Sequence, residues 1–174
     1  MKKILLSILL TLGFTLSFAD VLPDTSAETF TLTDTDGQQI HISHTDAGLN
    51  FQEHQGKAVF LVLFGHMCPP CNAEIPEFIE LTEKYKDKLA IVALEAQRYN
   101  MENLRAFKEK KGVNYSMVPG KENDEFIGYI AQRAGWSGQI PFLIALDKYG
   151  EVQDMKAGFV SKEELEELIL KLTK

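Results

Sequence analysis

A continuous apolar run followed at once by a Cys-Pro-Pro-Cys sequence most constrains the fold of this chain. Residues 57–65, KAVFLVLFG, are rich in β-branched and aromatic side chains, which is typical of a central strand covered on both faces of its sheet. Cys68 and Cys71, the two cysteines of the chain, come directly after this run. Functional sites in open α/β sheets lie at the carboxyl ends of the strands, so Cys68 is predicted to lie there.

Strands and helices alternate along the rest of the chain, in the predicted order hairpin, β, α, β, α, β, α, β, β, α. This order is typical of an α/β fold with a mostly parallel central sheet and helices on both faces. The last two strands add an antiparallel edge, which makes the sheet mixed. The strands are predicted within 30–43 (two), 57–65, 89–96, 114–120 and 141–158 (two), and the helices within 71–88, 100–112, 123–135 and 161–172.

The first residues have the three-part pattern of a secretory signal. Two lysines precede an apolar run over 4–18, and Ser17 and Ala19 are small residues suited to a cut after the latter. The run is shorter than the ~20 residues that span a bilayer, so cleavage is favoured over an uncleaved anchor. We expect residues 1–19 to be a signal peptide and residues 20–174 to form one domain. The two lysines are typical of bacterial export and predict a periplasmic location in a Gram-negative bacterium.

The charge of the chain bears on its partners. The formal net charge is −7, and loss of the two N-terminal lysines with the signal peptide changes it to −9. Nucleic acids bind basic surfaces, so a nucleic-acid partner is not expected. We expect a monomer with no bound cofactor.

Two cysteines with two residues between them allow three interpretations: a structural staple, a pair of metal ligands or a redox couple. A disulfide across so short a loop removes little entropy from the unfolded chain, which disfavours the staple. A structural zinc site needs four ligands, and no second CxxC or paired histidine spacing accompanies this one. Copper(I) accepts two thiolates, with Met67 as a further ligand, so a copper(I)-binding chaperone is the alternative to a redox enzyme.

In the redox interpretation the two cysteines have different tasks. Cys68 is predicted in the first turn of a helix, where unpaired amides and the helix dipole favour a thiolate. Its pKa is therefore expected below the ~8.5 of a free thiol, although Pro69 and Pro70 have no N–H to donate to the sulfur. Cys71 lies one turn deeper and is predicted to be the resolving thiol that breaks the mixed disulfide.

These features together resemble the thioredoxin superfamily along nearly all of residues 20–174. Besides the Cys-Pro-Pro-Cys sequence, Pro76 lies five residues after the second cysteine, and GQIPFLIALDKYGEV resembles the segment with the superfamily's cis-proline, here Pro141. CNAEIP, which contains Glu74, is similar to the exported TlpA/ResA-like thiol-disulfide oxidoreductases. The resemblance implies a thioredoxin-like fold with an N-terminal β-hairpin and a strand-helix insertion around 95–118.

The resemblance also implies roles for residues beside the cysteines. Substrate is expected at Ile140 and Pro141, where a cis bond leaves the backbone free to pair with an extended segment. Met67 stands where thioredoxins usually have Trp, so the substrate surface differs from theirs. Glu74 either accepts the proton of the resolving thiol or is an ordinary solvated side chain. His66 either favours the Cys68 thiolate when charged, next to the substrate, or is a solvated loop residue.

The chain is therefore predicted to be a periplasmic thiol-disulfide oxidoreductase that reduces disulfides of exported proteins. In the group that it resembles, the client is often apocytochrome c, and the electrons come from a membrane thiol reductase of the DsbD/CcdA kind. The direction of electron flow depends on the potential of the couple relative to its partners. A disulfide-forming oxidant is thus a further alternative.

Overall fold

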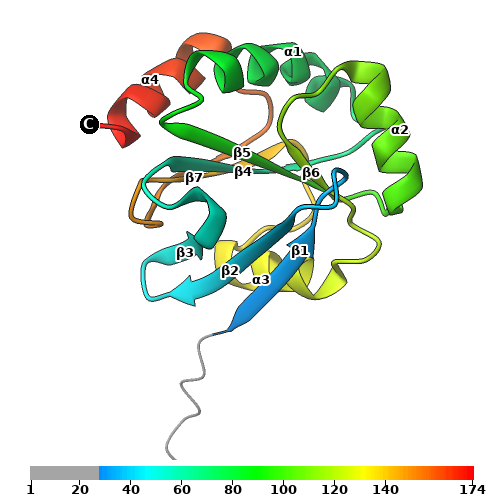
Figure 1. Ribbon diagram of the computed structural model, residues 1–174, viewed down its shortest axis with the longest axis horizontal. Coiled ribbons are helices and arrows are strands. Elements are labelled where there is room, and N and C mark those ends of the chain that lie inside the picture. The colour runs from blue at the N-terminus through cyan, green and yellow to red at the C-terminus, as the bar shows by residue number, and fades with distance from the viewer. Residues whose placement is uncertain (1–27) are drawn as a thin grey trace, which may run out of the picture.

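Figure 1 shows the computed structural model, which describes residues 28–174. The expected signal peptide, residues 1–19, lies outside the described residues. Within the described part, no helix is long and apolar enough to cross a membrane.

The elements of residues 28–174 follow the predicted order, with one short strand added after the hairpin. The strands are β1 Thr29–Thr33, β2 Gln39–Thr45, β3 Gly48–Phe51, β4 Ala58–Phe64, β5 Leu89–Glu95, β6 Ser116–Val118, β7 Phe142–Leu146 and β8 Val152–Ala157. The α-helices are α1 Pro69–Lys84, α2 Met101–Lys111, α3 Asp124–Ala134 and α4 Lys162–Leu172, and a short 3-10 helix covers Gln52–His54.

The central sheet has five strands in the order β6-β5-β4-β7-β8. β5 runs parallel to β4 and β6, whereas β7 runs antiparallel to β4 and β8. The predicted mixed sheet is confirmed, with β7 and β8 as its antiparallel edge, and β7 also pairs antiparallel with the central strand β4. Apolar periodicity indicates that a strand is buried on both faces and says nothing about its direction.

β4 separates two cores. Phe60 and Val62 belong to the core under α1, α2 and α4, on the upper side of the sheet in Figure 1. Val59 and Leu61 belong to the other core, which α3 and the three-stranded sheet cover from below. Every residue of β4 is buried, which is why its sequence is apolar without interruption. The strand that leads into the cysteines is therefore fixed from both faces and along both edges.

The N-terminal hairpin of β1 and β2 is confirmed, and β3 extends it to a three-stranded antiparallel sheet. β3 was not predicted because its four residues contain only Leu49 and Phe51 as apolar side chains, too few for a pattern. The strand is held by long-range bonds instead. The N–H of Leu49 donates to the carbonyl oxygen of Gly150, in the β7–β8 turn, at 2.9 Å.

Helix α4 begins with a capping box, for which Ser161 and Glu164 have the required spacing in the sequence. The Ser161 hydroxyl accepts from the N–H of Glu164 at 3.3 Å, and the Glu164 carboxylate accepts from the N–H of Ser161 at 3.2 Å. Ser161→Ala is expected to lower the free energy of unfolding by about 1 kcal/mol, measured by urea denaturation. Glu167→Gln, on the exposed side of the same helix, is the control, and an equal loss in both variants would contradict the capping role.

Candidate active site

The disulfide between Cys68 and Cys71 lies where β4 leads into α1. Cys68 is the N-cap residue, and Pro69 and Pro70 occupy the first helical positions, where a missing N–H costs no helical bond. The N–H of Cys71 donates to the Sγ of Cys68 at 3.2 Å. This amide supplies a donor that neither proline has, and a donor aimed at the sulfur favours its thiolate in the reduced protein.

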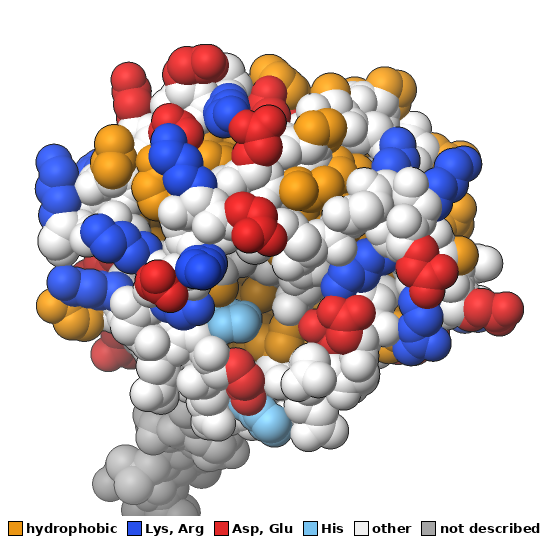
Figure 2. All heavy atoms as spheres, turned by 45° about the horizontal axis from the view of Figure 1, so that its top comes forward, with side chains coloured by type: hydrophobic (Ala, Val, Ile, Leu, Met, Phe, Trp, Pro, Cys, Tyr) orange, Lys and Arg blue, Asp and Glu red, His pale blue; other side chains and the backbone are white. Residues whose placement is uncertain are grey.

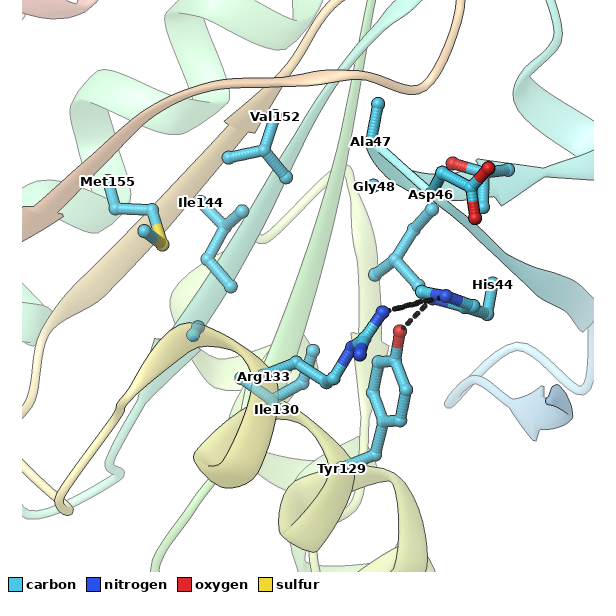
Figure 3. A pocket seen from close by; sticks show the side chains of 13 residues that line it. His44, Asp46, Ala47, Gly48, Tyr129, Ile130, Arg133, Ile144, Val152 and Met155 are labelled. Atoms are coloured by element: carbon cyan, nitrogen blue, oxygen red, sulfur yellow. Dashed lines mark hydrogen bonds between the residues drawn. The ribbon is translucent and has the colours of Figure 1, made fainter. Parts of the chain in front are cut away.

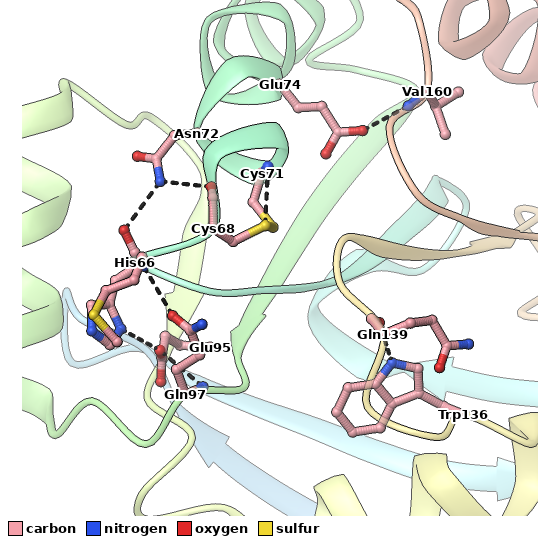
Figure 4. The surroundings of a disulfide bond; sticks show 11 residues. His66, Cys68, Cys71, Asn72, Glu74, Glu95, Gln97, Trp136, Gln139 and Val160 are labelled. Atoms are coloured by element: carbon pink, nitrogen blue, oxygen red, sulfur yellow. Dashed lines mark hydrogen bonds and ion pairs between the residues drawn. A yellow bond between two sulfur atoms is a disulfide. The ribbon is translucent and has the colours of Figure 1, made fainter.

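Both cysteines are buried, and Cys68 is slightly more exposed than Cys71. Cys68 is 6% exposed and Cys71 is 2% exposed, so the remaining access to the pair is mainly at Cys68. Figure 4 shows Cys71 one turn into α1, on the side of Glu74. Thiol exchange requires approach to a sulfur, and the slightly greater exposure of Cys68 favours approach at that residue.

Glu74 lies on α1 one turn beyond Cys71 and is only 2% exposed. The interpretation of Glu74 as a solvated side chain is therefore wrong. Its carboxylate accepts the N–H of Val160 at 2.8 Å (Figure 4). Burial raises the pKa of Glu74 to about 7, with a further contribution from the charge of Glu77, and the Val160 bond opposes the rise. Such a carboxyl group can take or release a proton near neutral pH.

A small cavity connects Cys71 with Glu74. Its volume is about 10 Å³, close to the smallest that holds one water, and Tyr115 is among the residues that line it. Burial and the charge of Glu74 both raise the pKa of Tyr115, so its hydroxyl keeps its proton. Cys71 and Glu74 thus line one common space.

A second buried carboxylate, which the sequence analysis missed, lies beside the loop that precedes the cysteines. Glu95, at the end of β5, is 0% exposed and accepts the Nδ1 of His66 at 2.8 Å (Figure 4). The His66 ring also stacks on Tyr99, with 3.4 Å between centroids. His66 is thus directed toward Glu95 and is not a solvated loop residue. The available signal was an acidic residue at the carboxyl end of a strand that neighbours β4.

The predicted substrate-binding residues lie around this loop. Met67 is 72% exposed, and its backbone N–H donates to the Oε1 of Gln97 at 2.9 Å. The predicted cis bond between Ile140 and Pro141 is confirmed. Ile140 packs against the loop, because a Cβ added to Gly65 would lie 2.6 Å from its Cδ1. The structure thus brings the loop, the cysteines and the cis-proline segment together.

The remaining surface offers a pocket apart from the disulfide. It has a volume of about 250 Å³ between β2–β3, α3 and β7–β8, and none of the predicted site residues lines it. On its polar side, Arg133 and Tyr129 both contact His44 (Figure 3).

Figure 2 shows acidic and basic side chains interspersed over the face of α1 and α4, without a broad area of one sign. Among residues 28–174, no three His, Cys, Asp or Glu side chains are grouped so as to hold a metal ion.

A cysteine at the N-cap of a helix, disulfide-bonded to a second cysteine one turn on, and a cis-proline define a thioredoxin-like thiol-disulfide oxidoreductase. The chain belongs to the AhpC/TSA family, whose sequence model matches residues 23–155. It is 31% identical over 148 residues to the thiol-disulfide oxidoreductase ResA of Bacillus anthracis, covering 84% of this chain and 76% of that protein. ResA of Geobacillus kaustophilus is 28% identical over 170 residues, which cover 94% and 88% of the two chains.

Solved structures share the fold. StoA from Bacillus subtilis superposes with a TM-score of 0.61 and 19% identity, over 82% of this chain and 96% of that one. A thiol:disulfide interchange protein of the thioredoxin family from Chlorobium tepidum gives a TM-score of 0.64 and 21% identity, over 85% and 95%. The thioredoxin-like, ResA-like assignment made from the sequence is confirmed.

Proposed function

We propose that this thiol-disulfide oxidoreductase acts in the periplasm, where it reduces disulfides of exported proteins. The observation that carries the proposal is that the two cysteines have different surroundings. Cys68 is slightly more exposed than Cys71, at 6% against 2%, and Cys71 lines the same cavity as Glu74, a carboxyl group that titrates near pH 7. This arrangement suits capture of a client at one sulfur and its release by the other.

The proposed cycle begins with both cysteines reduced. The Cys68 thiolate attacks one sulfur of the client disulfide, forms a mixed disulfide and releases the other client sulfur as a thiolate. Cys71 then loses its proton and attacks the Sγ of Cys68, which expels the second client thiolate and forms the Cys68–Cys71 disulfide. Two electrons have passed to the client, so a thiol reductant must return two electrons to the enzyme.

Glu74 is the proposed proton acceptor for Cys71. A buried thiol is a weak nucleophile until it loses its proton, and burial opposes that loss. Glu74 lines the same small cavity as Cys71 and ionises near neutral pH, so it can take this proton when the resolving attack occurs. The same carboxyl group can return the proton when the enzyme is reduced again.

The partners follow from the cycle and from the family. The relatives named ResA carry the activity thiol-disulfide oxidoreductase in their names. We propose exported proteins as clients, with apocytochrome c as one of them, and a membrane thiol reductase of the DsbD/CcdA kind as the electron donor. Cleavage of residues 1–19 would deliver the enzyme as a monomer to the periplasm.

Trapping of clients tests the proposal. In Cys71→Ala the resolving thiol is absent, so Cys68 is expected to hold its natural clients as mixed disulfides in cells. Purification without reductant, followed by mass spectrometry, identifies them. The double variant Cys68→Ser/Cys71→Ala is the control and should capture none. Recovery of cytoplasmic proteins alone would contradict the proposed location and clients.

A further inference from the structure

Glu95 is a buried acidic side chain that the reaction described above does not use. It ends β5 beside Phe64, the last residue of β4, at the point where the chain turns toward the cysteines. Its side chain is fully buried, and a buried carboxylate is costly unless it is well paired. A carboxylate kept at this point of the sheet therefore needs a structural reason.

Three N–H groups satisfy the Glu95 carboxylate. Oε1 accepts from the N–H of Gln97 at 3.0 Å and from the Nδ1 of His66 at 2.8 Å, and Oε2 accepts from the N–H of Tyr99 at 2.7 Å. The segment after β5, residues 96–99, bends around the carboxylate, and its Arg98 lies in the left-handed region at φ 67°. A non-glycine residue in this region is uncommon and is kept where the surrounding bonds require it.

This carboxylate reaches the loop before Cys68 by two routes. His66 is held through its ring, which lies between Glu95 and Tyr99. The Gln97 side chain, whose backbone Glu95 fixes, accepts the N–H of Met67 at 2.9 Å. The exposed Met67 side chain next to Cys68 is thus placed by bonds that originate at Glu95.

The Cys68 sulfur is held by other contacts. Its bond from the Cys71 amide belongs to α1, and the N–H of Cys68 donates to the carbonyl oxygen of Gly65. The side-chain amide of Asn72 donates to the carbonyl oxygens of both Cys68 and His66. The first turn of α1 therefore fixes the Cys68 sulfur and also holds the backbone of the 65–67 loop. Glu95 adds the bond to the His66 ring and, through Gln97, the bond to the N–H of Met67.

We propose that Glu95 is a positioning residue for protein clients. Through His66 and Gln97 it holds the 65–67 loop so that Met67 meets an apolar side chain beside the client's disulfide. The inference rests on the thiol-disulfide activity and is independent of the periplasmic location and of the direction of electron flow. A small disulfide does not extend to Met67, so its reaction with Cys68 is independent of Glu95.

Two substrates separate this role from a general loss of structure. Glu95→Ala is expected to lower kcat/KM for insulin reduction by about tenfold, mainly through a higher KM. The rate of the reduced variant with 2-hydroxyethyl disulfide should change by less than about twofold. Gln97→Ala, a change at a partly exposed side chain, should show the same split with a smaller loss. Glu95→Gln keeps one acceptor oxygen and should lie between Glu95→Ala and the unchanged protein.

A double-mutant cycle with Met67→Ala makes the test specific. If Glu95 acts by placing Met67, the double variant should be no worse with insulin than the poorer single variant. Ile169→Val, a core change in α4, controls for a loss of thermal stability and should leave both substrates unaffected. Equal losses on both substrates, additive effects of Glu95→Ala and Met67→Ala, or unchanged insulin kinetics in both Glu95→Ala and Gln97→Ala would overturn the proposal.

Discussion

Cys68→Ser is expected to abolish catalysis, with kcat/KM for insulin reduction falling by about 10³-fold or more. A serine hydroxyl is not ionised near neutral pH, so the attack that forms the mixed disulfide does not occur. The exposed fractions support this assignment, because Cys68 retains more access to solvent than Cys71. The measurement is insulin precipitation in the presence of dithiothreitol, with the uncatalysed rate subtracted.

The control for Cys68→Ser is a measurement showing that the variant is still folded. The far-ultraviolet circular dichroism of the variant should match that of the reduced protein, since β4 and α1 are held by their cores. If Cys71→Ser lost turnover while Cys68→Ser retained it, the assignment of the attacking and resolving thiols would have to be reversed.

Glu74→Gln is expected to slow the resolving step by about 10²-fold at pH 8. The carboxyl group must be ionised to take the proton of Cys71, so the rate of resolution in the unchanged protein should rise as the pH increases through about 7 and then level off. The variant should lack this inflection, because glutamine has no proton equilibrium in this range. Stopped-flow measurement of client release from the mixed disulfide gives both profiles, and identical profiles would exclude Glu74 as the base.

Glu74→Gln is expected to slow the resolving step but to raise the stability of the fold at neutral and alkaline pH. Since the folded-state pKa of Glu74 is about 7 and that of an unfolded carboxyl is ~4.3, its contribution to stability is full at low pH and is lost as the pH rises through 7. Between pH 4 and pH 8 this loss amounts to about 3 kcal/mol. Glutamine avoids it and still accepts the Val160 N–H. The variant should therefore gain stability over the unchanged protein as pH rises, measured by urea denaturation.

The sequence predicted the elements whose signals are local. Burial of β4 on both faces requires apolar residues at every position, and the cap of α4 requires Ser161 and Glu164 at fixed spacing. The direction of β7 and the existence of β3 depend on pairing between distant segments, which leaves no local pattern. Sequence reasoning was therefore accurate on element order and weaker on how the elements pair.

The candidate site divides in the same way. The cysteines, Glu74 and the cis-proline could be found because they fall within or near recognisable motifs. Glu95 was overlooked because it ends an otherwise apolar strand, and its partner His66 is far away in the sequence. Only the parallel pairing of β4 with β5 places the two side chains together.

The burial of β4 has a consequence for how the enzyme can respond to its own oxidation state. A strand packed between two cores and bonded along both edges is expected to resist a shift when the disulfide opens. Any rearrangement that tells a partner whether the enzyme carries electrons must be confined to the loop and the first turn of α1. A partner would therefore distinguish the reduced enzyme from the oxidised enzyme by small changes at the surface next to the cysteines, while β4 stays in place.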